Sequence, residues 1–189
     1  MDDSNQKFDP MMLMRQAKNG DSEAFGHLYE MYFTPVYRYI YLRLKNKEIA
    51  NDLTQNVFLK IFQSVVRWQE RNTSPLAYFF TVARNTVIDY YKKKKEIKIE
   101  NPEQVLNQLP DEAFNAEELL EKKDVSETVY RAIHCLTDDQ QEVIIMKFIN
   151  ELSNIEIAET LGKTEEAIRQ IQSRALQMLR EHFKQSKII

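Results

Sequence analysis

Apolar residues recur at helical spacing along most of the chain, and this periodicity limits the possible fold more than any other feature. One stripe runs from Phe25 to Leu44 in steps of three and one, and another runs from Leu53 to Val66. Such spacing gathers apolar side chains on one face of a helix, where they can be buried. Only three glycines and five prolines are available to turn a sheet. The sequence therefore predicts an all-α fold.

Local signals mark where several of these helices begin and end. The pair Asp9-Pro10 predicts a helix start, and Gly20 predicts the end of that helix. Pro35 lies inside the next stripe, where it is expected to bend or split the helix. Ser74-Pro75 predicts the start of another long helix, which we expect to end at Lys92–Lys95.

Charge is distributed unevenly, although the net charge of the chain is only −3. From Arg38 to Lys95 there are twelve basic and four acidic residues, a local balance of +8. From Glu96 to Glu127 there are three basic and ten acidic residues, a local balance of −7. A basic segment of this kind suits a nucleic-acid partner, which the net charge alone would conceal.

The acidic segment divides the chain. It contains Pro102 and Pro110 and lacks a sustained apolar period, which is typical of a flexible linker. We therefore expect two small helical domains, at residues 1–95 and 125–189, joined by an acidic flexible linker at 96–124.

The remaining composition argues against several classes of protein. A single Cys135 beside His134 has no spacing typical of a metal site, so no metal or cofactor is expected. Nucleophile–base pairs and phosphate-cradling glycine loops are lacking, which favours a binding protein over an enzyme. No apolar run approaches the roughly 18 residues of a membrane span, so we expect a cytoplasmic protein without membrane insertion.

The C-terminal domain contains a predicted helix-turn-helix. Ser153 and Glu156 form a capping box that opens a short helix, which Gly162 can end in the left-handed conformation. Thr164 caps the helix that follows. In this motif the second helix enters the major groove of duplex DNA.

The packing and the exposed face of this motif can also be predicted. Ala158 is small where the helices cross, and Ile155 and Ile168 are expected to fill the angle between them. Arg, Gln, Glu and Ser are side chains that bond base edges, although any surface helix is also polar on one side. The candidate base-reading residues are Thr164, Glu165, Glu166, Arg169, Gln170, Ser173 and Arg174.

The long helix from Pro75 and the loop before it combine cations with aromatic residues. Rings stack on unpaired bases and cations follow phosphates, so this composition suits single-stranded DNA. Phe79 and Phe80 are instead expected in the core, and a merely solubilising role is the alternative for the lysines. The candidate strand-binding residues are Trp68, Arg71, Asn72, Arg84, Asn85, Lys92 and Lys93.

Three segments together resemble extracytoplasmic-function (ECF) sigma factors of bacterial RNA polymerase. Asp52–Phe62 is similar to their polymerase-binding helix, and Pro75–Lys95 to their helix for the −10 promoter element. Leu136–Arg180 is similar to their second domain. The resemblance implies a non-catalytic transcription initiation factor whose partners are core RNA polymerase, promoter DNA and an anti-sigma factor.

The resemblance also implies roles for particular residues. The loop Trp68–Ser74 would capture an unstacked base of the non-template strand, with Arg84 and Asn85 beside it, and the helix from Thr164 would read the −35 element. The sequence of Gln170–Gln172 is more similar to that of primary sigma factors, so the resemblance does not determine which −35 bases this helix reads. The residues implied to dock on the clamp helices of the largest polymerase subunit are Asp52, Gln55, Asn56 and Phe58.

Two other functions are compatible with parts of the sequence. A helix-turn-helix regulator would bind duplex operators as a dimer, and an inhibitory or scaffolding protein would use the first domain for protein contacts alone. Neither accounts for a basic aromatic helix and a reader helix in one chain. Binding to core polymerase distinguishes a sigma factor from both.

Overall fold

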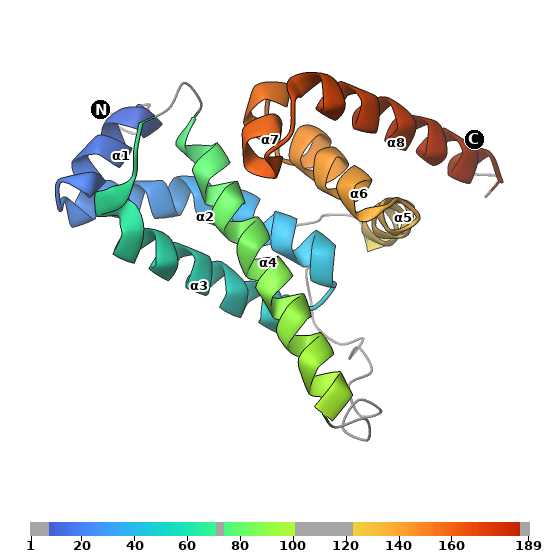
Figure 1. Cartoon of the computed structure of the whole chain (residues 1–189), viewed down its shortest axis with the longest axis horizontal. Coiled ribbons are helices and arrows are strands. Elements are labelled where there is room, and N and C mark those ends of the chain that lie inside the picture. The colour runs from blue at the N-terminus through green and yellow to red at the C-terminus, as the bar shows by residue number, and fades with distance from the viewer. Residues whose placement is uncertain (1–7, 71–73, 101–122, 186–189) are drawn as a thin grey trace. The chain divides into compact units, whose positions relative to one another are not determined.

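The structure is a computed structural model that describes residues 8–70, 74–100 and 123–185. Every regular element in these ranges is a helix, as the sequence predicts (Figure 1). The chain divides into two compact units: unit 1 is Met1–Leu44 with Glu48–Tyr91, and unit 2 is Lys45–Lys47 with Lys92–Ile189. Within the described ranges, no helix has both the length and the apolar character needed to cross a membrane.

Unit 1 is built on long helices whose starts follow the local signals. The Asp9 carboxylate accepts a hydrogen bond of 3.0 Å from the Met11 amide, which confirms the predicted start of the first helix. Asp21 in the same way accepts from the amides of Glu23 and Ala24. The elements are α1 (Pro10–Lys18), α2 (Ser22–Leu44), α3 (Lys47–Ser64), the 3₁₀ turn η1 (Val65–Arg67) and α4 (Pro75–Glu100).

Pro35 does not split α2, which runs without interruption from Ser22 to Leu44. Proline inside a helix removes one backbone hydrogen bond and crowds the preceding turn. Buried side chains on both sides of Pro35, including Tyr32, Val36 and Ile40, hold the helix against its neighbours. Packing therefore offsets the local cost.

Aromatic rings fill the core of unit 1. Phe79 and Phe80 of α4 are fully buried, as predicted, together with Tyr39 of α2. The ring of Phe79 lies 4.9 Å from that of Tyr32 and 5.3 Å from that of Phe58, while Phe80 lies 5.4 Å from Tyr39. These contacts fasten α4 to α2 and α3, so that the outward face of α4 has a fixed direction.

Unit 2 contains shorter helices around an aliphatic core. Leu136, Ile144 and Ala175 are buried there, and Leu176 and Leu179 pack against them. The elements are α5 (Lys123–His134), α6 (Asp138–Ile144), the π-helical turn η3 (Ile145–Ile149), α7 (Asn154–Leu161) and α8 (Glu165–Gln185).

Two boundaries differ from those expected. The helix predicted to continue through Phe148 widens into η3, where the Asn150 amide donates to the Ile145 carbonyl at 3.1 Å. Ile145 and Met146 of this wider turn are buried. The helix α4 extends to Glu100, five residues into the predicted linker, because residues such as lysine and glutamate favour helix. Residues 101–122 of that predicted linker lie outside the described ranges.

Candidate nucleic-acid interface

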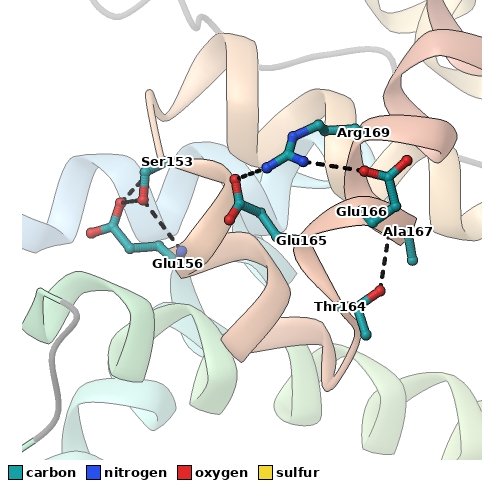
Figure 2. Close-up of polar contacts among 7 residues, drawn as sticks. All are labelled: Ser153, Glu156, Thr164, Glu165, Glu166, Ala167 and Arg169. Atoms are coloured by element: carbon teal, nitrogen blue, oxygen red, sulfur yellow. Dashed lines mark hydrogen bonds and ion pairs between the residues drawn. The ribbon is translucent and has the colours of Figure 1, made fainter.

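The predicted helix-turn-helix is formed by α7 and α8. Ser153 and Glu156 make the predicted capping box: the Ser153 amide donates to the Glu156 carboxylate at 2.7 Å, and the Glu156 amide donates to Ser153 Oγ at 3.3 Å (Figure 2). Gly162 ends α7 in the left-handed region, with φ of 62°. Thr164 Oγ1 then accepts from the Ala167 amide at 3.2 Å, which starts α8. These four predicted signals are confirmed.

The side chains in the angle between α7 and α8 differ in part from the prediction. Ile168 and Ala158 are buried as expected, but Ile155 is 57% exposed. Ile157 takes the expected place and is fully buried. Because two helical positions differ by about 200° around the axis, Ile155 and Ile157 point in nearly opposite directions. The prediction for Ile155 is therefore wrong.

The outward face of α8 carries the candidate base-reading residues. Their positions recur at helical intervals of three and four, so the side chains lie along one side of the helix. Glu165 is half-exposed. The exposed members are Thr164, Glu166, Arg169, Gln170, Ser173 and Arg174.

Arg169 is held in place by two carboxylates from the preceding turn of α8. Its Nη2 atom bonds to Glu165, and its Nη1 atom lies 3.2 Å from Glu166 Oε2 (Figure 2). Hydrogen bonding to Glu165, followed by the interactions with Glu166, raises the pKa of Arg169. Both acids also lie in the first turn, where they interact favourably with the helix dipole. The guanidinium is thus oriented before any DNA is present.

A further ion pair fixes the turn of the motif. Lys163 Nζ, between α7 and α8, lies 3.0 Å from Asp139 Oδ2 of α6. The sequence analysis did not identify this pair, since the two residues are far apart in the chain. It joins the turn to the rest of unit 2.

The candidate strand-binding residues of α4 and of the loop before it differ in exposure. Arg84 is half-buried, and Asn85, Lys92 and Lys93 are exposed on α4. Arg71 and Asn72 lie outside the described ranges.

Trp68 does not occupy the position expected for a base-stacking residue. Only 7% of it is exposed, so its ring belongs to the core of unit 1. Its amide donates to the Val65 carbonyl at 2.9 Å, which closes η1 and turns the side chain inward. In this conformation the Trp68 ring is not exposed for stacking, and the DNA-binding role of Trp68 stays a prediction.

The candidate polymerase-binding residues of α3 also differ in how far they are buried. Asp52, Gln55 and Asn56 are exposed, whereas Phe58 is only 3% exposed. The Phe58 ring lies 4.7 Å from that of Tyr29. Phe58 is thus a core residue of unit 1, and its predicted part in docking on polymerase stays a prediction.

Three apolar residues that the sequence analysis did not select are exposed instead. Leu59 is 55%, Phe62 51% and Val66 60% exposed. Leu59 is apolar but falls outside the apolar stripe of its helix, and this break in period could have identified it as exposed. These three residues, of which Val66 lies in η1 directly after α3, are termed the α3 face together with the exposed Asp52, Gln55 and Asn56.

Comparison with family models finds two matches, one in each half of the chain. Sigma-70 region 2 matches residues 28–97, and Sigma-70, region 4 matches residues 132–181. The first range covers α3 and most of α4, and the second covers the helix-turn-helix.

Similar proteins agree with these matches. The ECF RNA polymerase sigma factor BldN of Streptomyces coelicolor is 32% identical over 169 residues, which are 89% of this chain and 64% of BldN. The ECF RNA polymerase sigma factor SigX of Bacillus subtilis is 27% identical over 168 residues, 85% of this chain and 84% of SigX.

Solved structures share the fold. CnrH, in complex with the cytosolic domain of CnrY, has a TM-score of 0.70 at 19% identity and covers 93% of this chain and 97% of that one. RpoE of Bartonella quintana, in complex with the anti-sigma factor NepR, has a TM-score of 0.66 at 21% identity. The match covers 85% of this chain and 96% of the RpoE chain.

The helix-turn-helix and the two matched regions define a sigma-70 protein, which is a transcription initiation factor. Region 2 and region 4 occur in the order that the resemblance in the sequence implied. Within this family the chain belongs to the ECF sigma factors.

Proposed function

We propose that this chain binds core RNA polymerase and directs it to promoters through separate contacts with the −10 and −35 elements. The observation that carries the proposal is the presence, in one chain, of a region 4 reader helix and a region 2 unit with an exposed α3 face. A duplex-binding regulator would need only the first of these.

The α3 face is the proposed docking surface for polymerase. Large apolar side chains in water are unfavourable unless a partner covers them, and Leu59, Phe62 and Val66 are each more than half exposed. Asp52, Gln55 and Asn56 lie on α3, and their polar groups can fix the direction of docking. The clamp helices of the largest polymerase subunit are the proposed partner. Phe58 supports this face from the core.

The α4 helix is the proposed contact for the unpaired −10 strand. Arg84 and Asn85 lie near its middle, and Lys92 and Lys93 follow about two turns later, on a helix that Phe79 and Phe80 hold in the core. Extruding a base costs a few kcal/mol, which contacts with bases and phosphates must offset. Arg71 and Asn72 remain proposed members of the same site.

The outward face of α8 is the proposed reader of the −35 duplex. An arginine that bonds guanine through two donors discriminates against other bases by about 1–3 kcal/mol. Arg169 is the strongest candidate, because Glu165 and Glu166 already restrict its guanidinium. Thr164, Gln170, Ser173 and Arg174 would complete the contacts.

Regulation by an anti-sigma factor is part of the proposal. RpoE was solved in complex with the anti-sigma factor NepR, and CnrH was solved in complex with the cytosolic domain of CnrY. An inhibitor that covers the α3 face would exclude polymerase and remove exposed apolar surface at once. Because the proposed partner polymerase acts in the bacterial cytoplasm, we place the chain there, with a binding role and no catalysis.

Reconstitution with core RNA polymerase tests the proposal. The purified chain is added to core enzyme, and transcription is measured from a promoter library. We expect stable association with core enzyme and enrichment of promoters with two separated motifs. Retained duplex binding without core association would identify a helix-turn-helix regulator instead.

A further inference from the structure

Side chains of α1 bond to the segment that leaves η1. Arg15 Nε donates to Glu70 Oε2 at 2.9 Å, and Arg15 Nη2 donates to the other oxygen of the same carboxylate. Lys18 Nζ donates to the Trp68 carbonyl at 2.8 Å. The bonded residues are 55 and 50 positions apart in the chain, so α1 binds this segment at two points along its length.

Burial of Trp68 supplies a third attachment. Its ring lies in the core while its carbonyl accepts from Lys18, so both sides of this residue are fixed. The segment Trp68–Glu70 is thereby held where the predicted capture loop Trp68–Ser74 begins. At the other end of that loop, Pro75 is buried and the Ala77 amide donates to the Ser74 carbonyl at 3.1 Å.

The Arg15–Glu70 pair is better suited to positioning than to general stability. Its side chains are 57% and 45% exposed, and exposed ion pairs contribute little to the stability of a fold. A two-point bond between guanidinium and carboxylate does restrict direction. Hydrogen bonding between the partners raises the pKa of Arg15 and lowers that of Glu70, so both remain charged near neutral pH.

We propose that Arg15 and Lys18 are positioning residues for −10 strand capture, acting from α1 on the start of the capture loop. Bonds that hold Trp68–Glu70 in place before a base binds lower the entropic cost of that binding. The inference rests on the proposed function, because it assigns α1 a part in the same site. It also gives Trp68 a role as an anchor in place of a base-stacking ring.

The rival explanation is direct contact of both cations with DNA phosphates. The two explanations differ in the role of Glu70. If Arg15 binds phosphate, Glu70 competes with DNA, and removing its charge strengthens binding. If Arg15 positions the loop, removing the Glu70 charge weakens strand capture as much as removing Arg15 does.

Promoter opening by reconstituted holoenzyme separates these outcomes. Permanganate reactivity of −10 thymines is measured for Arg15→Met, Lys18→Met, Glu70→Gln and the exchange Arg15→Glu with Glu70→Arg. We expect each single change to reduce opening by about two- to fivefold at unchanged core affinity, and the exchange to recover most of the loss. Improved opening by Glu70→Gln, or failure of the exchange, would overturn the proposal.

Arg67→Met is the matched control for loss of one positive charge. Arg67 is exposed in η1, close to the same segment, but lies outside this set of bonds. We expect it to open promoters at least twice as well as Arg15→Met. Equal loss in both variants would indicate a general charge effect and contradict a specific anchor.

Tryptophan fluorescence gives a readout that needs no DNA, since Trp68 is the only tryptophan of the chain. We expect Arg15→Met and Lys18→Met to shift its emission to the red and to increase quenching by acrylamide, while Arg67→Met leaves both unchanged. Unchanged Trp68 emission in the first two variants would refute the anchor. If wild-type protein opens no promoter but emission shifts as expected, the proposed function fails and the anchor stands.

Discussion

Arg169 illustrates how one residue can limit base specificity. Replacing it by alanine should weaken binding to a −35 duplex by about 1–3 kcal/mol and relax selectivity at one base pair. Arg169→Lys should not restore selectivity, because a single ammonium cannot bond two acceptors in the same planar arrangement. Fluorescence anisotropy with duplexes that differ at single base pairs measures both effects.

Gln177→Ala provides a control further along α8, where the Gln177 side chain donates to Glu181 of the same helix. It should leave duplex affinity within twofold of wild type. If Arg169→Ala weakened all duplexes equally, Arg169 would be a phosphate contact, and the base-reading role would be wrong.

Glu70 offers a direct titration test of its ion pair. Arg15 lowers the pKa of Glu70 below its ordinary value, so Arg15→Met should raise that pKa. The favourable contribution of the pair is complete above the ordinary carboxyl pKa and is lost as the pH falls through the lowered one. NMR titration of the Glu70 carboxyl carbon follows this shift, and an unmoved pKa would show that the pair does not persist in solution.

Three residues differ in burial from what their predicted roles suggested, and the physical reason is the same for each. Phe58, Trp68 and Ile155 were assigned from residue type and local spacing, whereas burial depends on which neighbours pack against each helix. Phe58 and Trp68 were expected at interfaces and lie in the core, while Ile155 was expected in the core and is exposed. The Arg15–Glu70 pair joins residues 55 positions apart, so no local pattern could indicate it.

At the level of elements, exposed and buried residues of α3 are expected to contribute to different properties, namely polymerase binding and stability. Leu59→Lys replaces an exposed side chain, so it should abolish most binding to core polymerase with little change in unfolding free energy. Phe58→Ala removes a buried ring and should destabilise unit 1 by about 3–5 kcal/mol. Urea unfolding and a core-binding assay on both variants check this contrast. Strong destabilisation by Leu59→Lys would contradict an exposed docking role.

Helix ends were predictable because their signals are local. Gly162 adopts φ of 62°, and open space surrounds the position of an added Cβ, so Gly162→Ala should cost about 1 kcal/mol through backbone strain alone. Gly26 lies inside α2 with equally open surroundings, and Gly26→Ala should stabilise by roughly 0.5–1 kcal/mol. Thermal unfolding measures both, and effects of equal sign would contradict the conformational argument.

The elements that the sequence did not predict depend on packing over longer distances. Asp9, Ser153, Gly162 and Thr164 act within a few residues, and each did as expected. The π-helical turn η3 requires the buried surroundings of Ile145 and Met146, and the continuity of α2 through Pro35 requires packing on both sides. Periodicity alone contains no information about such neighbours.

For the whole molecule, we expect the two units to act at different steps of initiation. Arg84→Ala should reduce strand opening several-fold while leaving the affinity of the closed complex nearly unchanged, because Arg84 lies on the α4 helix of unit 1. Arg169→Ala should instead weaken the closed complex. Binding to duplex promoter and permanganate reactivity, measured on the same holoenzymes, distinguish the steps. Equal effects of both changes on closed-complex affinity would contradict this division.

The exposed side chains of Leu59, Phe62 and Val66 also affect how the free protein behaves at high concentration. Apolar groups in water promote self-association, and a net charge of −3 provides only modest repulsion between copies. Charged substitutions on the α3 face would improve solubility, yet they would alter the same surface that is proposed to meet polymerase. Solubility and docking therefore place opposing demands on the α3 face, and the yield of a variant in purification is a poor guide to its activity in transcription.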